Sequence, residues 1–136
     1  MKVAILDSSV LWYWIKADES EQSKHALLLR EEHYSGELAV VVPRLVFTEL
    51  LNIGARAYHL TDRYMDELAE HLENLAFDVK DPPLRDVAMW AASGLTAYDA
   101  TYVALAVETG LPLITDDREI LRKIPHSAIP LIPSGP

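Results

Sequence analysis

The sequence predicts an α/β fold in which a central, mainly parallel sheet is flanked by helices on both faces. Short apolar segments alternate with segments of helical periodicity along the chain, as strands and helices do around parallel sheets. The apolar segments lack the alternation of polar and apolar residues that marks a sheet with one solvated face. No internal repeat or long Gly/Ser linker divides the 136 residues, so we expect a single domain, residues 1–136.

The first part of the chain predicts one strand followed by two helices. Lys2–Leu6 is a short apolar run stopped by Asp7-Ser8-Ser9, which is typical of a buried strand followed at once by a capped helix, here Val10–Lys16. Glu21–Tyr34 carries apolar residues among charges and ends at Ser35-Gly36, as helices do when a glycine terminates them. The turn between the first strand and the first helix therefore contains an acid.

The later segments repeat this strand and helix alternation. Leu38–Val42 is apolar and β-branched and ends at Pro43, and Leu45–Tyr58 then returns to helical spacing. The remaining expected elements are a helix capped by Thr61 that runs through Asn74, a weak strand Phe77–Lys80, helices Leu84–Ser93 and Tyr98–Thr109, a strand Leu111–Thr115, a helix Asp117–Ile124 and a strand Ile129–Ile132. The Pro-rich tail beyond Ile132 is expected to be mobile.

Composition narrows the possible functions before any motif is considered. The absence of cysteine excludes disulfides, thiolate metal sites and Cys nucleophiles, which leaves His, Asp and Glu as the strong metal ligands. A net charge of −9 disfavours a passive nucleic-acid-binding module, but not a metal-dependent nuclease whose cations supply the positive charge. No apolar run approaches the roughly 20 residues of a membrane span and the start does not read as a signal peptide, so we expect a cytoplasmic protein.

Four carboxylates are the candidate functional residues. Asp7 and Asp117 follow expected strands, at the edge where parallel sheets bind their ligands. Glu49 borders the buried stripe of its helix, and Asp99 begins a helix that carries no other charge until Glu108. An acid in so apolar a segment is costly to desolvate unless it is paired or metal-bound. A cluster of carboxylate oxygens suits Mg²⁺ or Mn²⁺, which can activate water to attack a phosphodiester.

Each acid also has a purely structural explanation. Asp7 fits a helix cap beside two serines. Asp99 is favoured in a first helical turn by the helix dipole, and Glu49 fits an ion pair with Arg56 or another base. Taken together, however, four such acids favour one common site over four coincidences.

Four segments that contain these acids occur in a distinctive order. They are Ile5-Leu6-Asp7-Ser8-Ser9-Val10, Thr48-Glu49-Leu50, Tyr98-Asp99-Ala100-Thr101-Tyr102-Val103-Ala104-Leu105-Ala106 and Leu113-Ile114-Thr115-Asp116-Asp117. This series closely resembles that of PIN-domain ribonucleases, specifically the VapC-type toxins of toxin–antitoxin pairs. The resemblance covers nearly the whole chain, and the third segment is its most specific part. It implies a three-layer PIN-like fold, an Mg²⁺- or Mn²⁺-dependent endoribonuclease, a homodimer, and inhibition by a small cognate antitoxin.

The resemblance also implies roles for individual residues. It places the metal ligands of the family, for one or two ions, on Asp7, Glu49, Asp99 and Asp117. It places the Ser/Thr of the family on Thr115, which is expected to orient Asp117 or a water on the metal. Ser8 and Ser9 follow the first acid and are able to hydrogen-bond a ligand carboxylate or such a water. Asp116 occupies a variable position, which leaves open which aspartate points inward; we expect Asp116 to be the exposed cap and Asp117 the inward group.

Other side chains are assigned by their surroundings in the sequence. Trp12, Tyr13 and Trp14 are consecutive on a short helix and cannot all face one core, so we expect at least one to meet a partner, either an antitoxin or a second copy; a packed helix with one exposed aromatic is the alternative. Met89 and Trp90 are expected in the core. The five histidines are scattered among polar residues and are expected at the surface.

Two other functions stay open at this point. A phosphohydrolase with an Asp nucleophile after the first strand would prefer a second acid where this chain has Ser9, and would need a downstream Lys motif that the sequence lacks. A catalytically idle PIN-like module would bind RNA or a protein without turnover, although the presence of all four acids disfavours it.

Overall fold

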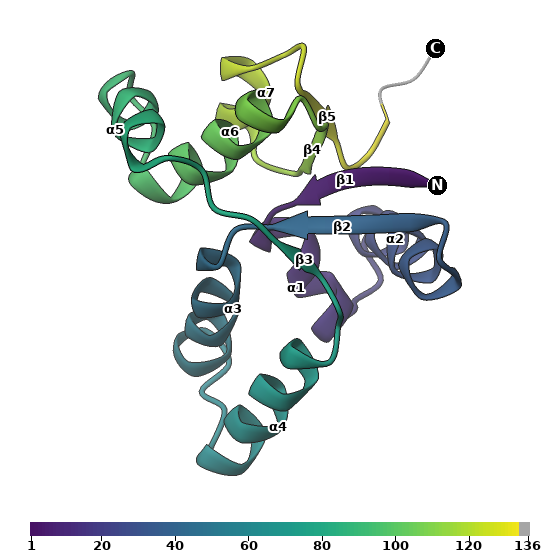
Figure 1. Cartoon of the computed structure of the whole chain (residues 1–136). Coiled ribbons are helices and arrows are strands. Elements are labelled where there is room, and N and C mark those ends of the chain that lie inside the picture. The colour runs from purple at the N-terminus through teal and green to yellow at the C-terminus, as the bar shows by residue number, and fades with distance from the viewer. Residues whose placement is uncertain (134–136) are drawn as a thin grey trace.

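Five parallel strands form the sheet in the computed structural model, which describes residues 1–133 (Figure 1). Their order is β3-β2-β1-β4-β5, and every neighbouring pair is parallel. The strands are β1 (Lys2–Leu6), β2 (Leu38–Val42), β3 (Asp78–Val79), β4 (Leu113–Thr115) and β5 (Ala128–Pro130). The predicted parallel α/β fold is therefore confirmed. The expectation for the tail falls, beyond Pro133, on residues outside the described part of the chain.

The boundaries of three strands differ from the prediction. β3 is Asp78–Val79 rather than Phe77–Lys80. β4 begins at Leu113 rather than Leu111, because Pro112 has no amide hydrogen to donate, although its carbonyl accepts from the Ile5 amide at 2.9 Å. β5 begins at Ala128 and ends at Pro130, where the pairing with Thr115 ends. The differences in β4 and β5 both involve a proline: Pro112 lies just before β4, and Pro130 is the last residue of β5.

Seven helices accompany the sheet within residues 1–133. They are α1 (Ser8–Ile15), α2 (Glu21–Ser35), α3 (Leu45–Arg56), α4 (Asp62–Glu73), α5 (Leu84–Ala92), α6 (Ala97–Thr109) and α7 (Arg118–Lys123). The two long helices α2 and α6 end at Gly36 and Gly110, whose φ angles of 85° and 71° are left-handed, as the sequence predicts. α1 begins two residues earlier than expected because Asp7 itself is its N-cap.

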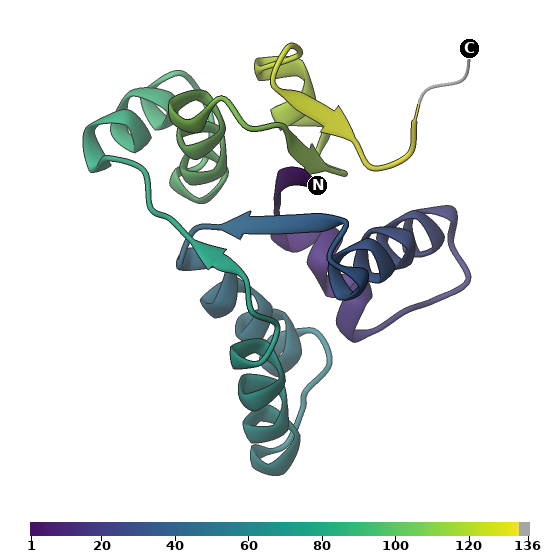
Figure 2. The same ribbon diagram turned by 45° about the vertical axis from the view of Figure 1, so that its right-hand side comes forward.

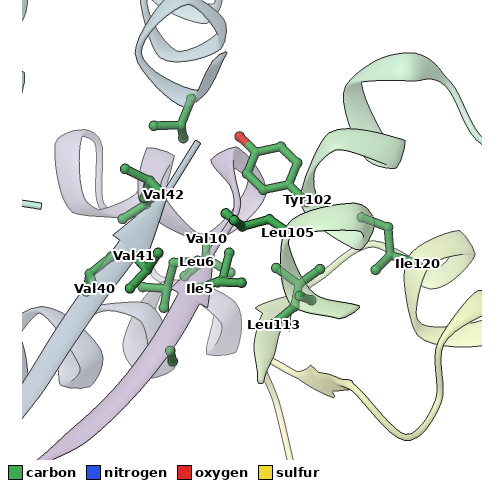
Figure 3. Packing of buried hydrophobic residues seen from close by; sticks show 14 of the residues in the cluster. Ile5, Leu6, Val10, Val40, Val41, Val42, Tyr102, Leu105, Leu113 and Ile120 are labelled. Atoms are coloured by element: carbon green, nitrogen blue, oxygen red, sulfur yellow. The ribbon is translucent and has the colours of Figure 1, made fainter. Parts of the chain in front are cut away.

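The helices separate into two groups around the β1–β2 pair. Figures 1 and 2 show α5, α6 and α7 on one side and α1, α2, α3 and α4 on the other. The core between the groups is made of apolar side chains that are almost completely buried, including Ile5, Leu6, Leu105, Leu113 and Ile120 (Figure 3). Full burial of each such side chain contributes about 1.5–3 kcal/mol. The strands β1, β2 and β4 are mostly apolar because the sheet is covered on both faces there, whereas both residues of the edge strand β3 are exposed.

The order of the strands creates a switch point beside β1. β1 pairs with β2 on one edge and with β4 on the other, with Ile5 opposite Leu113 and Leu6 opposite Ile114. The first half of the chain therefore extends the sheet on one side of β1, and the second half extends it on the other side. In such sheets a crevice opens outside the carboxyl ends of the strands at this point. Asp7 and the residues after Thr115 lie at this place, because β1 ends at Leu6 and β4 ends at Thr115. Figure 1 shows β1 and β2 side by side, with both arrowheads at the left-hand end of the strands.

The aromatic run of α1 divides between the core and a groove. Trp14 is buried, whereas Trp12 is partly buried and stacks on Tyr58 with ring centroids 5.0 Å apart.

Met89 does not lie in the core as expected, since it is 71% exposed on the outer face of α5. The local sequence does not reveal this, because α5 packs mainly against α6 and leaves one apolar face uncovered within residues 1–133.

His33 is a second departure from the prediction. Its ring is partly buried, with Nε2 2.6 Å from the Leu75 carbonyl oxygen and Nδ1 3.3 Å from that of Leu38. It also packs against Trp14 and Phe77. All these partners come from other elements, so the polar neighbours of His33 in the sequence gave no indication of its environment.

None of the helices in residues 1–133 combines the length and the apolar character that crossing a bilayer requires.

Candidate active site

Asp7 is buried at the end of β1, and both of its carboxylate oxygens accept hydrogen bonds. Oδ1 accepts from the Ser9 hydroxyl at 2.5 Å and from the Val10 amide at 3.3 Å, and Oδ2 accepts from the Thr115 hydroxyl. The residue is only 4% exposed. Burial raises the pKa of Asp7 from 3.8 to about 6, although these hydrogen bonds lower it, and the charge of Asp117 adds to the rise. Asp7 therefore caps α1, as its structural explanation requires, and its ionised form is also unusually costly to bury.

Two hydroxyl groups join the turn after β1 to the turn after β4. Ser9 Oγ donates to Asp7 and accepts from the Asp116 amide at 3.2 Å. Thr115 Oγ1 donates to the other oxygen of Asp7 and accepts from the Asp117 amide at 2.9 Å. Each hydroxyl therefore fixes the Asp7 carboxylate relative to the backbone of the Asp116-Asp117 pair. The sequence resemblance implies that Thr115 orients Asp117 or a water on the metal, but it does not indicate the hydrogen bond from Thr115 to Asp7.

Asp117 caps α7 and is partly buried. Its Oδ1 caps α7 by accepting from the amides of Glu119 and Ile120 at 2.8 and 3.1 Å. The side chain is partly buried, whereas Asp116 is exposed. The expectation that Asp116 is the cap is wrong, because α7 begins at Arg118 and only the preceding residue reaches its free amides.

Glu49 is held on α3 by a hydroxyl group from α6. The Tyr102 hydroxyl donates to Glu49 Oε1, and Figure 3 shows this hydroxyl pointing away from Leu105 at the rim of the core. Burial raises the pKa of Glu49, the Tyr102 hydrogen bond lowers it, and the charge of Asp99 raises it. Burial and the charge of Glu49 raise the pKa of Tyr102 above 10, so the phenol stays protonated. The alternative explanation of Glu49, an ion pair with Arg56 or another base, is not found among the ion pairs of residues 1–133.

Asp99 lies in the first turn of α6, as its structural explanation requires. Thr96 is the N-cap of the helix, and its hydroxyl accepts from the Asp99 amide at 3.1 Å. Burial raises the pKa of the partly buried Asp99, the charge of Asp117 raises it further, and Thr96 lowers it. The charge of Asp117 therefore raises the pKa of both Asp99 and Asp7.

The four acids form an electrostatically linked group. Asp117 acts on Asp7 and Asp99, and Asp99 acts on Glu49. None of the ion pairs in the described chain involves any of the four. Carboxylates that raise one another's pKa without a base nearby favour a bound cation. Their all-oxygen donor set, with neighbouring hydroxyls, fits a hard divalent ion such as Mg²⁺ or Mn²⁺.

The ligand set is not preassembled in this structure. Within residues 1–133, no three His, Asp or Glu side chains approach closely enough to hold a metal ion between them. Mg²⁺ usually retains several waters and is bound through only one or two carboxylates, so direct contact with all four acids is not required. The arrangement is a rim of acids around the switch point, two of which, Asp7 and Glu49, are fixed by hydroxyl groups.

Comparison with known proteins identifies the family of the chain. The family model for the PIN domain matches residues 4–126. The chain belongs to the PIN domain family. Ribonuclease VapC3 of Pyrobaculum aerophilum is 28% identical to this PIN domain over 131 residues, which cover 96% of the chain and 100% of that protein. Exonuclease VapC9 of the same organism is 44% identical over 59 residues, 40% of the chain and 44% of that protein.

Two solved structures share the fold of this PIN domain. The crystal structure of PAE2754 from Pyrobaculum aerophilum matches with a TM-score of 0.67 and 30% identity, over 96% of this chain and 92% of that one. A toxin–antitoxin complex from Klebsiella pneumoniae matches with a TM-score of 0.62 and 19% identity, over 96% and 99%. The PIN-like α/β architecture predicted from the sequence is thus confirmed.

Two residues that contact the acids of this PIN domain, Thr96 and Tyr102, were not identified from the sequence. Thr96 caps the helix that carries Asp99. Tyr102 lies three residues after Asp99, within the most specific segment of the series, and its hydroxyl holds Glu49. The only signal was its spacing, because residues three apart on a helix share a face. Its target, 53 residues away in the sequence, required knowledge of how α3 faces α6.

Proposed function

We propose that this PIN domain is a metal-dependent endoribonuclease and the toxin of a type II toxin–antitoxin pair. The observation that carries the proposal is the buried Asp7 carboxylate, whose pKa is raised to about 6 beside other acids without a compensating base. At neutral pH a carboxylate in this environment is ionised at a cost in stability, and a bound cation would offset that cost. The full-length similarity to a protein named Ribonuclease VapC3 supports RNA as the substrate.

The ligands that we propose for Mg²⁺ or Mn²⁺ are Asp7, Glu49, Asp99 and Asp117. When bound, the ion lowers the pKa of a coordinated water and offsets the charge that develops on the phosphodiester. The protein itself holds the proposed ligands in position. Ser9 and Thr115 hold the Asp7 carboxylate, and the Tyr102 hydroxyl holds Glu49. Preorganised ligands of this kind reduce the reorganisation needed when charge develops during the reaction.

The test is cleavage of a structured RNA pool by the purified protein with Mg²⁺, with Mn²⁺ and with a chelator. Asp7→Asn and Asp99→Asn are expected to abolish cleavage while the protein stays folded. Asp116→Asn is the matched control, because it removes an exposed acid next to the site and is expected to cut like the parent. Turnover of small phosphate esters instead of RNA would support a phosphohydrolase, and metal-independent RNA binding without turnover would support an idle binding module.

We infer that the cognate antitoxin occupies a groove between α1 and α4. The groove has a volume of about 460 Å³ and is lined by aromatic and apolar side chains that include Trp12, Ile15, Tyr58, Leu60 and Tyr64. An amphipathic antitoxin segment suits such a surface. The test is neutralisation of RNA cleavage by the product of an adjacent small gene. Neutralisation that is unchanged by Trp12→Ala would refute this assignment.

We also propose that the protein is a homodimer, and that the second copy covers the outer face of α5 and α6. Met89 and Val107 are 71% and 49% exposed there and line one depression together with Trp90 and Ala104, so apolar side chains are concentrated on this surface. Sedimentation analysis of the parent and of Met89→Glu tests the proposal. A parent protein that sediments as a monomer, or a Met89→Glu variant that remains a dimer, contradicts it.

A further inference from the structure

We propose that a cleft beside the four acids binds one nucleobase of the RNA, with the base stacked on the ring of Tyr98. The inference rests on the proposed ribonuclease function and adds a site that reads the substrate. The cleft has a volume of about 410 Å³. α3 contributes Thr48, Asn52 and Ile53 to its lining, α6 contributes Tyr98, and Ser8 and Glu49 lie where the cleft meets the candidate active site.

The cleft is continuous with the carboxylates. Glu49 belongs to both, Ser8 follows Asp7, and Tyr98 precedes Asp99. Figure 1 shows α3 and α6 on opposite sides of the sheet edge at which β1 and β2 end. A nucleotide whose phosphate lies at the acids therefore brings its own base, or a neighbouring base, to the mouth of this cleft.

The chemistry of the lining favours a base over a phosphate. The lining contains no Lys or Arg, and its one charged group is the Glu49 carboxylate, so a second phosphate would be repelled. A base is neutral, flat and rich in hydrogen-bonding edges. The exposed Thr48 hydroxyl and Asn52 amide can both donate and accept hydrogen bonds at such an edge. RNA is read most often in this way, through unstacked bases on aromatic side chains.

Tyr98 is the side chain suited to stacking. It is 61% exposed, and among the aromatic pairs within residues 1–133 it has no ring partner. Tyr58, in contrast, is already stacked on Trp12. Tyr98 is also four residues before Tyr102, so both lie on the face of α6 that is directed toward α3.

The binding test uses a short single-stranded RNA that carries the fluorescent base 2-aminopurine, titrated in the presence of a chelator so that no cleavage occurs. Stacking on Tyr98 is expected to quench the fluorescence. Tyr98→Phe keeps the ring and is expected to retain quenching, whereas Tyr98→Ala is expected to bind at least about five-fold more weakly. Tyr34→Ala, which removes a tyrosine of similar exposure on α2, is the control and is expected to bind like the parent.

The kinetic test uses the metal-loaded protein and sequencing of the cut sites. Tyr98→Ala is expected to raise KM and to broaden the base distribution beside the cut, while Asn52→Ala alters only the base preference. Absence of quenching with the parent protein, or equal quenching and equal cut sites with Tyr98→Ala, overturns the inference. The two hypotheses fail separately: metal-dependent cutting that ignores Tyr98 refutes the base site alone, and quenching without cutting under any metal condition refutes the nuclease.

Discussion

The Asp7 carboxylate makes the metal-free protein less stable as the pH rises. Its pKa is about 6 in the folded state and 3.8, the ordinary value, when exposed. The folded protein therefore binds the proton more tightly than the unfolded chain does. The contribution of protonated Asp7 to stability is fully present below pH 3.8 and is lost as the pH rises through about 6. A difference of about two pKa units corresponds to about 3 kcal/mol of unfolding free energy.

The prediction is best tested by the slope of the unfolding free energy against pH. Urea unfolding of the parent protein in a chelator, followed by tryptophan fluorescence between pH 4 and pH 7, is expected to show this loss. The raised pKa values of Glu49 and Asp99 act in the same direction. Asp7→Asn cannot ionise and is expected to lose about 3 kcal/mol of the pH dependence, whereas Asp116→Asn retains the slope of the parent. The absolute stability of Asp7→Asn is less informative, because an amide cannot accept from both hydroxyls.

A divalent ion is expected to reverse this loss. Because Mg²⁺ or Mn²⁺ binds the ionised form, addition of the ion at pH 7 stabilises the parent in proportion to the logarithm of its concentration, and stabilises Asp7→Asn much less. Identical pH slopes for the parent and Asp7→Asn would refute the reasoning, since Asp7 would then titrate alike in the folded and unfolded states.

Three further predictions concern individual contacts. Thr115→Val removes a buried hydroxyl that serves Asp7 and a backbone amide, so the unfolding free energy is expected to fall by about 1–3 kcal/mol and RNA cleavage to be lost, while Thr115→Ser preserves both; equal urea midpoints for the Val variant and the parent would contradict this. Tyr102→Phe releases Glu49 and is expected to weaken Mn²⁺ binding in calorimetry, with no further weakening when Glu49→Gln is already present. Gly54→Ala places a methyl group 3.0 Å from a leucine side chain of α4; overpacking of about 1–3 kcal/mol exceeds the gain of about 1 kcal/mol from replacing a glycine inside a helix, so a small net fall in the unfolding free energy is expected in the same urea assay.

The fold was predictable because its signals are local. The apolar runs of β1 and β2 and the terminal glycines Gly36 and Gly110 lie within the elements that they define. The positions of Asp7 and Asp117 were also predictable, because both acids follow strands directly and parallel strands end at one edge.

The contacts of the site were not predictable, because they join distant parts of the chain. The bond between Tyr102 and Glu49 depends on the distance and rotation of α6 relative to α3. The bond between Thr115 and Asp7 depends on β4 lying next to β1 rather than at another place in the sheet. No pattern of periodicity or spacing within one element contains either piece of information.

The bonds between the two turns have a consequence for how the protein is made. Asp7 is synthesised 108 residues before its partner Thr115, and Asp117 follows Thr115. A ribosome-bound chain therefore holds an incomplete set of acids until α7 has left the exit tunnel. The switch point can close only after β4 has been synthesised, so a product that ends before β4 carries Asp7 without the Thr115 hydroxyl that binds its second oxygen.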